Sequence, residues 1–147
     1  MPRIILDANV VASALINPEG TPGTLVKGLF SGFDLELVLS PGILEEYHRC
    51  TKYLRVQKHL RVGAEEIKSR LEELAVAAIW VDGLMNVESS ISDRDDKMYL
   101  AAAVEGLANF IVTGDRDLKV LGSHGGVQIV TPRYFVDNHF HKLPRGG

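Results

Sequence analysis

The sequence predicts an α/β fold built on a mostly parallel sheet, and two observations support this prediction. Short, mainly apolar runs without sustained polar alternation recur along the chain, which is typical of strands buried on both faces of a parallel sheet. These runs occupy residues 3–6, 35–39, 78–81, 109–113 and 127–130. Stretches with helical periodicity lie between most of them, and strands that alternate with helices favour parallel pairing.

The first strand ends in Asp7, and residues 8–16, which are mostly small or apolar, indicate a helix directly after it. Residues 17–23 contain two Pro and two Gly and predict a loop. Thr21 is expected to cap a helix over residues 22–31 that begins with a proline.

Ser40 and Pro41 repeat the pattern of a cap followed by a proline, and they predict a helix over residues 42–54. A polar connection, 55–63, leads to an amphipathic helix over 64–77. The apolar face of that helix consists of Ile67, Leu71 and Leu74.

The second half of the chain continues the alternation of strands and helices. The predicted elements are a strand at 78–81, a loop at 82–92, a helix at 94–107 capped by Asp93, a strand at 109–113, a short helix at 115–121, a turn at 124–126, a strand at 127–130 and a helix at 132–139. The aromatic residues expected in the core are Trp80, Phe110 and Phe135.

Length and composition indicate one globular domain over residues 1–141 and a disordered tail over 142–147. The chain has 147 residues, 46% of them hydrophobic, which is enough for a sizeable core. Its apolar runs are too short for a membrane span or a signal peptide. The single cysteine, Cys50, excludes an intramolecular disulfide and is expected to be a small buried residue, so we expect a cytoplasmic protein.

The net charge of -3 disfavours a domain that coats nucleic acid with a generally basic surface. A nucleic-acid role would need a local basic patch or metal ions. Basic residues do recur every three positions, at Arg49, Lys52, Arg55, Lys58 and Arg61. This row could guide a polyanion, but a solvated face near the end of a helix is the explanation we prefer.

Two acids follow strands directly or nearly so, and they should share one edge of the sheet. Asp7 comes after the first strand, and Asp115 comes after the strand at 109–113. In a parallel sheet both positions are at the carboxyl ends of strands, where open α/β proteins hold their ligands.

Helical phase selects Glu46 as a third acid at this edge. Successive helical residues turn by about 100°. Glu46 therefore lies beside the apolar stripe that contains Ile43, Tyr47 and Cys50, whereas Glu45 points to the opposite side.

The same test selects Asp96 as the fourth acid. Asp96 lies four residues before Leu100 in the apolar stripe of the helix at 94–107, a stripe that also includes Leu107, while Asp95 turns away from it. Each acid alone could instead cap a helix. Four carboxylates gathered at one edge repel one another unless a cation or a shared proton offsets their charge. If a cation does so, oxygen ligands suit Mg²⁺ or Mn²⁺.

Smaller polar residues could orient these carboxylates or bound water. Asn9 and Ser13 share one helix face just after Asp7, and Thr113 lies two residues before Asp115. Local capping and helix packing are the alternative roles for them. Asp117 is a possible fifth acid or a residue of the first turn of a helix.

Four segments together resemble PIN-domain nucleases, and within them a VapC-like branch of toxins from toxin–antitoxin pairs. The segments are Ile-Ile-Leu-Asp7-Ala-Asn9-Val-Val-Ala-Ser13, Leu-Ser-Pro-Gly-Ile-Leu-Glu-Glu46-Tyr, Ser-Asp-Arg-Asp-Asp96-Lys-Met-Tyr-Leu-Ala-Ala-Ala and Phe-Ile-Val-Thr113-Gly-Asp115-Arg-Asp-Leu. The resemblance covers most of the chain, and the order and spacing of the segments make it specific.

The resemblance implies a doubly wound, three-layer α/β/α fold and Mg²⁺- or Mn²⁺-dependent cleavage of RNA with one or two ions. It places the acidic site on Asp7, Glu46, Asp96 and Asp115, supported by Asn9, Ser13 and Thr113. Members of the family often form homodimers and are inhibited by a small antitoxin partner.

Two other functions fit parts of the sequence. Haloacid-dehalogenase-like phosphatases also place an Asp after the first strand, but they need a second Asp two residues later, where this chain has Asn9. A non-catalytic RNA- or protein-binding module could retain the acidic pocket without activity.

Overall fold

The computed structural model describes residues 2–31, 35–56, 63–85, 94–114, 123–124 and 126–140, with the side chains of residues 54–56, 94–96 and 124 excepted. In this part of the chain six strands form one sheet, in the order β3-β2-β1-β4-β6-β5. The strands are β1 (Arg3–Leu6), β2 (Glu36–Leu39), β3 (Ile79–Trp80), β4 (Phe110–Val112), β5 (Ser123–His124) and β6 (Val127–Val130). Pairing is parallel from β3 to β6, and β5 is antiparallel to β6. The predicted α/β class with a mostly parallel sheet is confirmed.

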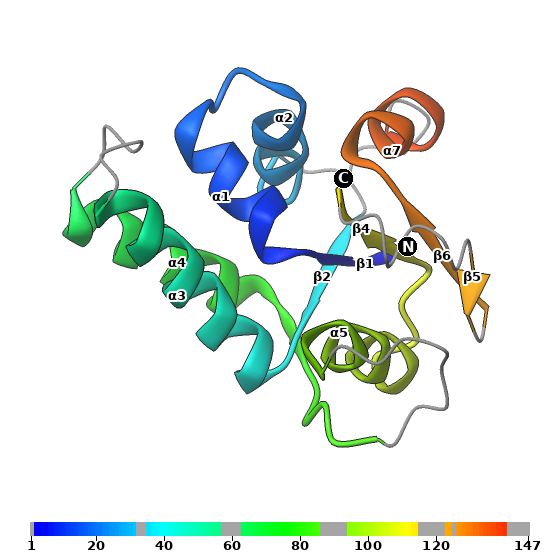
Figure 1. The fold of residues 1–147 in the computed structure, drawn as a ribbon. Helices are drawn as coiled ribbons and strands as arrows, with labels where there is room; N and C mark the ends of the chain where they lie inside the picture. The colour runs from blue at the N-terminus through cyan, green and yellow to red at the C-terminus, as the bar shows by residue number, and fades with distance from the viewer. Residues whose placement is uncertain are drawn as a thin grey trace.

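Helices lie on both faces of this sheet and make three layers (Figure 1). The described helices are α1 (Ala8–Ile16), α2 (Thr21–Gly28), α3 (Pro41–Val56), α4 (Ala64–Ala77), α5 (Arg94–Glu105) and α7 (Pro132–Asn138). On one face α5 packs against β1, β2 and β4, and on the other α2 lies beside α7. This is the doubly wound α/β/α architecture that the resemblance implies.

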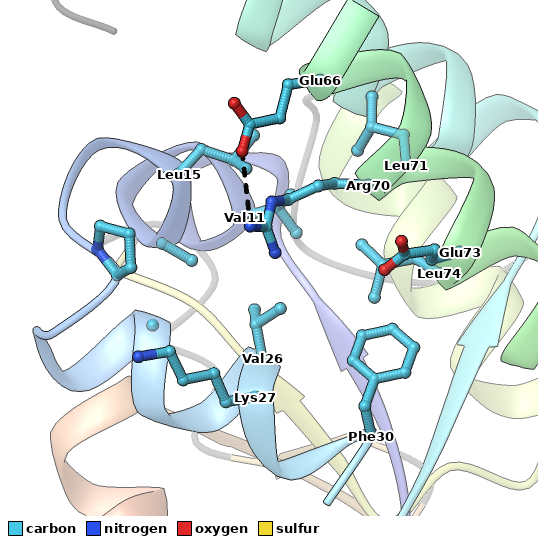
Figure 2. A pocket seen from close by; sticks show the side chains of 13 residues that line it. Val11, Leu15, Val26, Lys27, Phe30, Glu66, Arg70, Leu71, Glu73 and Leu74 are labelled. Atoms are coloured by element: carbon cyan, nitrogen blue, oxygen red, sulfur yellow. Dashed lines mark hydrogen bonds and ion pairs between the residues drawn. The ribbon is translucent and has the colours of Figure 1, made fainter. Parts of the chain in front are cut away.

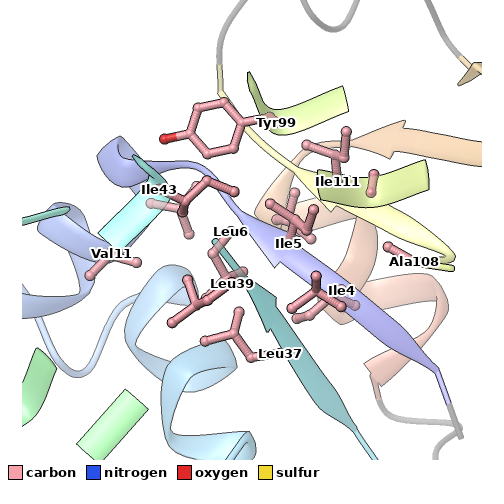
Figure 3. Packing of buried hydrophobic residues seen from close by; sticks show 14 of the residues in the cluster. Ile4, Ile5, Leu6, Val11, Leu37, Leu39, Ile43, Tyr99, Ala108 and Ile111 are labelled. Carbon is pink, nitrogen blue, oxygen red and sulfur yellow. The ribbon is translucent and has the colours of Figure 1, made fainter. Parts of the chain in front are cut away.

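Strand β1 forms the centre of the hydrophobic core. The side chains of Ile4, Ile5 and Leu6 have no exposed surface. Ile4 is in register with Leu37 of β2, and Ile5 with Ile111 of β4 (Figure 3). Because β1 is covered on both faces, its sequence shows no polar alternation. Each such side chain contributes about 1.5–3 kcal/mol of burial free energy.

The chain changes its direction of strand addition beside β1. It places β2 and β3 on one side of β1, then β4 and β6 on the other. Open α/β proteins bind ligands outside the carboxyl ends of the strands at such a switch point. Asp7 follows β1 and Thr113 follows β4, so both residues lie there.

Several predicted elements have the observed bounds, and the first helix, α1, is one of them. The prediction for α2 was wrong at its start, because Thr21 is the first helical residue and not the cap. Gly20 occupies the N-cap position in an extended conformation and makes no side-chain cap hydrogen bond. The predicted end at residue 31 was also wrong, since the helix ends at Gly28.

The cap predicted for α3 is present. The Ser40 hydroxyl oxygen accepts a hydrogen bond from the Ile43 backbone N–H at 3.2 Å. The helix continues to Val56, two residues beyond its predicted end, and thereby shortens the polar connection.

Two apolar residues predicted to be buried are exposed. Leu107 is 74% exposed, because α5 ends at Glu105 and Leu107 adopts a positive φ of 54° after it. Trp80 is 43% exposed in the edge strand β3, and its ring N–H donates to the Ala75 carbonyl oxygen at 2.9 Å. Phe135 is buried as predicted.

The prediction that the turn at residues 124–126 includes His124 was wrong. Ser123 and His124 form strand β5, while Gly126, with a φ of +85°, occupies the turn before β6. The predictions for residues 57–62, 86–93, 115–121 and 142–147 lie outside the described residues. None of the described helices is long and apolar enough to span a membrane.

An apolar pocket of about 150 Å³ lies between α1, α2 and α4 (Figure 2). Val11, Val26 and Leu74 contribute to its walls, and an ion pair of 3.5 Å joins Glu66 and Arg70 at its border. None of the described residues that line it belongs to the predicted acidic site. The pocket is therefore separate from the carboxyl edge of β1.

Candidate acidic site

Asp7 is held at the switch point by hydrogen bonds to both carboxylate oxygens. Its Oδ2 accepts from the Thr113 hydroxyl at 2.5 Å, and its Oδ1 accepts from the Asn9 backbone N–H at 3.2 Å. The second bond makes Asp7 the N-cap of α1. Only 6% of Asp7 is exposed. The capping role weighed for this acid is thus present, together with a bond across two neighbouring strands.

The backbone continues this connection between strands. The Asp7 N–H donates to the Val112 carbonyl oxygen at 3.0 Å, and the Thr113 N–H donates to the Val130 carbonyl oxygen at 2.9 Å. Hydrogen bonds therefore connect the carboxyl end of β1 to that of β4, and the carboxyl end of β4 to that of β6. This rigid edge fixes where the Asp7 carboxylate lies.

Glu46 has the orientation that helical phase predicts. Its side chain is 21% exposed, whereas Glu45 on the opposite side of α3 is exposed to solvent. Its Oε2 pairs with the guanidinium group of Arg49, whose side chain is 68% exposed. Glu46 is therefore partly buried and forms an ion pair with a cation at the surface.

Cys50 connects α3 with the start of α1. Its thiol donates a hydrogen bond to Oδ1 of Asn9 at 3.5 Å, and the residue is half-buried, less so than expected. Burial raises the pKa of the Cys50 thiol, and the negative charges of Glu46 and then Asp7 raise it further. Both carboxylates therefore lie close enough to the Cys50 thiol to affect its pKa.

Two tyrosines at the site were not singled out from the sequence. The Tyr47 hydroxyl donates to the Leu6 carbonyl oxygen at 2.6 Å, and the Tyr99 hydroxyl accepts from the Ala8 N–H at 3.0 Å. Figure 3 shows the Tyr99 hydroxyl turned toward the start of α1. The available signal was chemical, since a tyrosine in an apolar stripe needs a hydrogen-bond partner when it is buried.

The remaining predicted site residues are placed to different extents. Ser13 is exposed on α1, on the same side as Asn9. Asp96 lies in the first turn of α5, but its side chain is outside the described part of the chain, as are Asp115 and Asp117 entirely. The choice of Asp96 over Asp95 therefore stays a prediction.

The basic row is likewise only partly described. Arg49 and Lys52 are exposed on α3. The Arg55 side chain and Lys58 lie outside the described residues. A role in guiding a polyanion stays a prediction.

The chemistry of the donors bears on whether a metal ion suits this site. Among the described residues, no group of three or more His, Cys, Asp or Glu side chains is arranged to hold one. Asp7, Glu46 and Thr113 offer oxygen atoms, the donor type that Mg²⁺ and Mn²⁺ bind. Burial, and after it the charges of Glu46 and Asp7, raise the pKa of the neighbouring Cys50 thiol, which disfavours the thiolate. The described donors therefore fit a hard divalent ion.

Comparisons with known proteins agree with this fold. An uncharacterised protein, MJ1680, of Methanocaldococcus jannaschii is 29% identical over 92% of this chain and 90% of its own. A chain of the crystal structure of VapBC2 from Rickettsia felis, bound to a DNA fragment from their promoter, matches with a TM-score of 0.52. The two chains are 16% identical, over 86% of this chain and 96% of that one, so the match shows the fold alone.

A family model gives the more specific assignment. The model described as PIN domain matches residues 3–117, which is most of the chain and runs from the start of β1 past Thr113. The chain belongs to the PIN-domain family.

Proposed function

We propose that this protein is a divalent-metal-dependent endoribonuclease that cleaves RNA phosphodiesters and acts as the toxin of a cytoplasmic toxin–antitoxin pair. The observation that carries the proposal is the Asp7–Thr113 hydrogen bond at the switch point of a PIN-domain chain. It holds a carboxylate rigidly at the place where such sheets bind ligands.

Asp7, Glu46, Asp96 and Asp115 would hold one or two Mg²⁺ or Mn²⁺ ions. When bound, such an ion lowers the pKa of a coordinated water and stabilises charge on the leaving oxygen. The Thr113 hydroxyl and the Asn9 backbone N–H restrict the rotation of the Asp7 carboxylate through their hydrogen bonds. Ser13 and Asp117 would orient water or the other acids.

The proposal includes an RNA substrate and two protein partners. RNA would approach along the basic row on α3, of which Arg49 and Lys52 are described and Arg55 and Lys58 are not. A small antitoxin protein would block the acidic site, and two copies of the chain would form a homodimer. The motifs of the VapC-like branch support both partners, and the fold likeness to a chain of VapBC2 supports the antitoxin alone.

A second candidate function is a non-catalytic RNA- or protein-binding module. The ion pair of Glu46 with Arg49 favours it, because a paired carboxylate is less available to a metal ion. The small free energy of this ion pair argues against the second candidate. An exposed i,i+3 ion pair contributes about 0–1 kcal/mol, so a divalent ion would readily displace Arg49 from Glu46.

The test compares the purified wild-type protein with Asp7→Asn on single-stranded and structured RNA, with Mg²⁺, Mn²⁺ or a chelator. Asn is as good an N-cap as Asp, so the variant should fold while losing cleavage. Asp137→Asn, at an exposed position on α7, is the matched control and should stay active. Mn²⁺ should raise the melting temperature of the wild type and not of Asp7→Asn, since binding stabilises the native state. Full activity of Asp7→Asn, purified free of contaminating nuclease, would contradict the proposal.

A further inference from the structure

Two buried tyrosine hydroxyls bind the main chain on either side of Asp7. Tyr47 of α3 donates to the carbonyl oxygen of Leu6, the residue before Asp7, at 2.6 Å. Tyr99 of α5 accepts from the N–H of Ala8, the residue after Asp7, at 3.0 Å. Both tyrosines are buried, with 0% and 3% of their surface exposed.

We propose that Tyr47 and Tyr99 are positioning residues for the divalent-ion site, each fixing one acid-bearing helix relative to Asp7. This inference rests on the proposed function. Tyr47 directly follows Glu46 on α3, and Tyr99 lies three residues after Asp96 on α5, which is about one turn of the helix. Each hydroxyl therefore sets how far a predicted ligand-bearing turn stands from the Asp7 backbone.

Packing alone would not require these hydroxyls. Phenylalanine would fill nearly the same volume, and a hydroxyl buried without a partner costs free energy. Both hydroxyls are bonded, and both to main-chain groups, which cannot change rotamer. The Ala8 N–H belongs to the first turn of α1, where helix N–H groups have no partner within the helix. The tyrosines thus supply the hydrogen bonds that the strand-to-helix turn at Asp7 needs.

The test measures Mn²⁺ binding by isothermal titration calorimetry without RNA, using the full-length wild type, Tyr47→Phe and Tyr99→Phe. Loss of a hydrogen bond that orients metal ligands weakens metal binding by about 10- to 100-fold, so each Phe variant should bind Mn²⁺ at least about tenfold more weakly. RNA cleavage should need correspondingly more Mn²⁺ and should recover at saturating Mn²⁺.

Thr51→Val is the matched control. Thr51 is a buried residue of the same helix as Tyr47, and its hydroxyl donates to the Tyr47 carbonyl oxygen at 2.8 Å, within α3. The control should lose stability comparable to that lost by Tyr47→Phe and keep wild-type affinity for Mn²⁺, so it separates general destabilisation from positioning.

Each outcome decides one point. Unchanged Mn²⁺ affinity in both Phe variants, beside a wild type that binds Mn²⁺, would overturn the positioning role and leave the proposed function intact. An equal loss of affinity in Thr51→Val would also overturn it. A wild type that binds no Mn²⁺ at millimolar concentrations would overturn both the inference and the proposed function.

Discussion

The Thr113 hydroxyl and the Asp7 carboxylate, 106 positions apart in the chain, are joined by a hydrogen bond of 2.5 Å. The bond crosses from the end of β4 to the end of β1, where the order of strand addition reverses. Both residues are buried, so the bond is shielded from water and restricts the carboxylate strongly. The proposed site thus depends on a contact that the parallel pairing of β1 and β4 creates.

Thr113→Val should lower both the stability and the metal affinity of the protein. The change keeps the shape of the Thr113 side chain but removes its hydroxyl. Asp7 Oδ2 therefore loses its buried hydrogen-bond donor. The free energy of unfolding should fall by about 1.5–3 kcal/mol, as is typical when a hydrogen bond to a charged group is removed. Urea unfolding and Mn²⁺ titration measure the two effects. Thr113→Ser, which keeps the hydroxyl, is the control, and an equal loss in both variants would assign the effect to packing.

Glu46→Gln should reduce RNA cleavage, while Glu45→Gln should not. The two positions are adjacent on α3, yet Glu46 is partly buried near Cys50 and Glu45 is exposed. Both changes remove one negative charge from the same helix, so the pair isolates position from net charge. Initial rates of RNA cleavage at several Mg²⁺ concentrations measure the difference. Similar rates for the two variants would remove Glu46 from the proposed site.

Cys50 alkylation should report on the two acids without any need for catalysis. Burial raises the pKa of this thiol most, followed by Glu46 and Asp7. Removing either negative charge lowers the pKa, which raises the thiolate fraction at a given pH and speeds reaction with iodoacetamide. The rate at pH 8 should increase in Glu46→Gln, and less in Asp7→Asn. Glu45→Gln should react like the wild type, and faster reaction in that variant would mean that the acids are arranged differently.

The sequence was sufficient for those features that local patterns determine. The orientation of Glu46 could be predicted because α3 is amphipathic, and helical geometry then decides which neighbour faces the protein. Leu107 shows where the same reasoning stops, since α5 ends at Glu105 and periodicity has no meaning beyond a helix end. Trp80 is exposed because β3 is an edge strand, and the strand order cannot be read from local sequence patterns. The hydroxyls of Tyr47 and Tyr99 bind residues distant in sequence. A tyrosine in an apolar stripe indicates that a hydrogen-bond partner is needed, but not which residue supplies it.

Tyr47→Phe should flatten the alkaline loss of stability. The folded chain keeps the Tyr47 proton at a pH where the unfolded chain, with an ordinary pKa near 10.0, releases it. The free energy of unfolding that this pKa difference contributes is therefore complete below about pH 10, and it is lost as the pH rises toward the higher pKa of the folded state. Urea unfolding of the wild type and the variant at pH 8, 10 and 11 measures the difference in free energy. A constant difference between the two proteins at all three pH values would contradict the prediction.

Asp96→Asn should abolish RNA cleavage, while Asp95→Asn should leave it near the wild-type rate. The reason is helical phase. Position 96 lies four residues before the buried Leu100 on α5 and so shares its face of the helix. Position 95 is turned by about 100° around the helix axis from position 96. Both residues occupy the first turn of α5, where a negative charge favours the helix, so the two changes should cost similar and small amounts of stability. RNA cleavage, Mn²⁺ affinity and melting temperature of the two variants together measure the effect. A result in which Asp95→Asn is inactive and Asp96→Asn active would move the ligand to the neighbouring position and keep the rest of the proposed site.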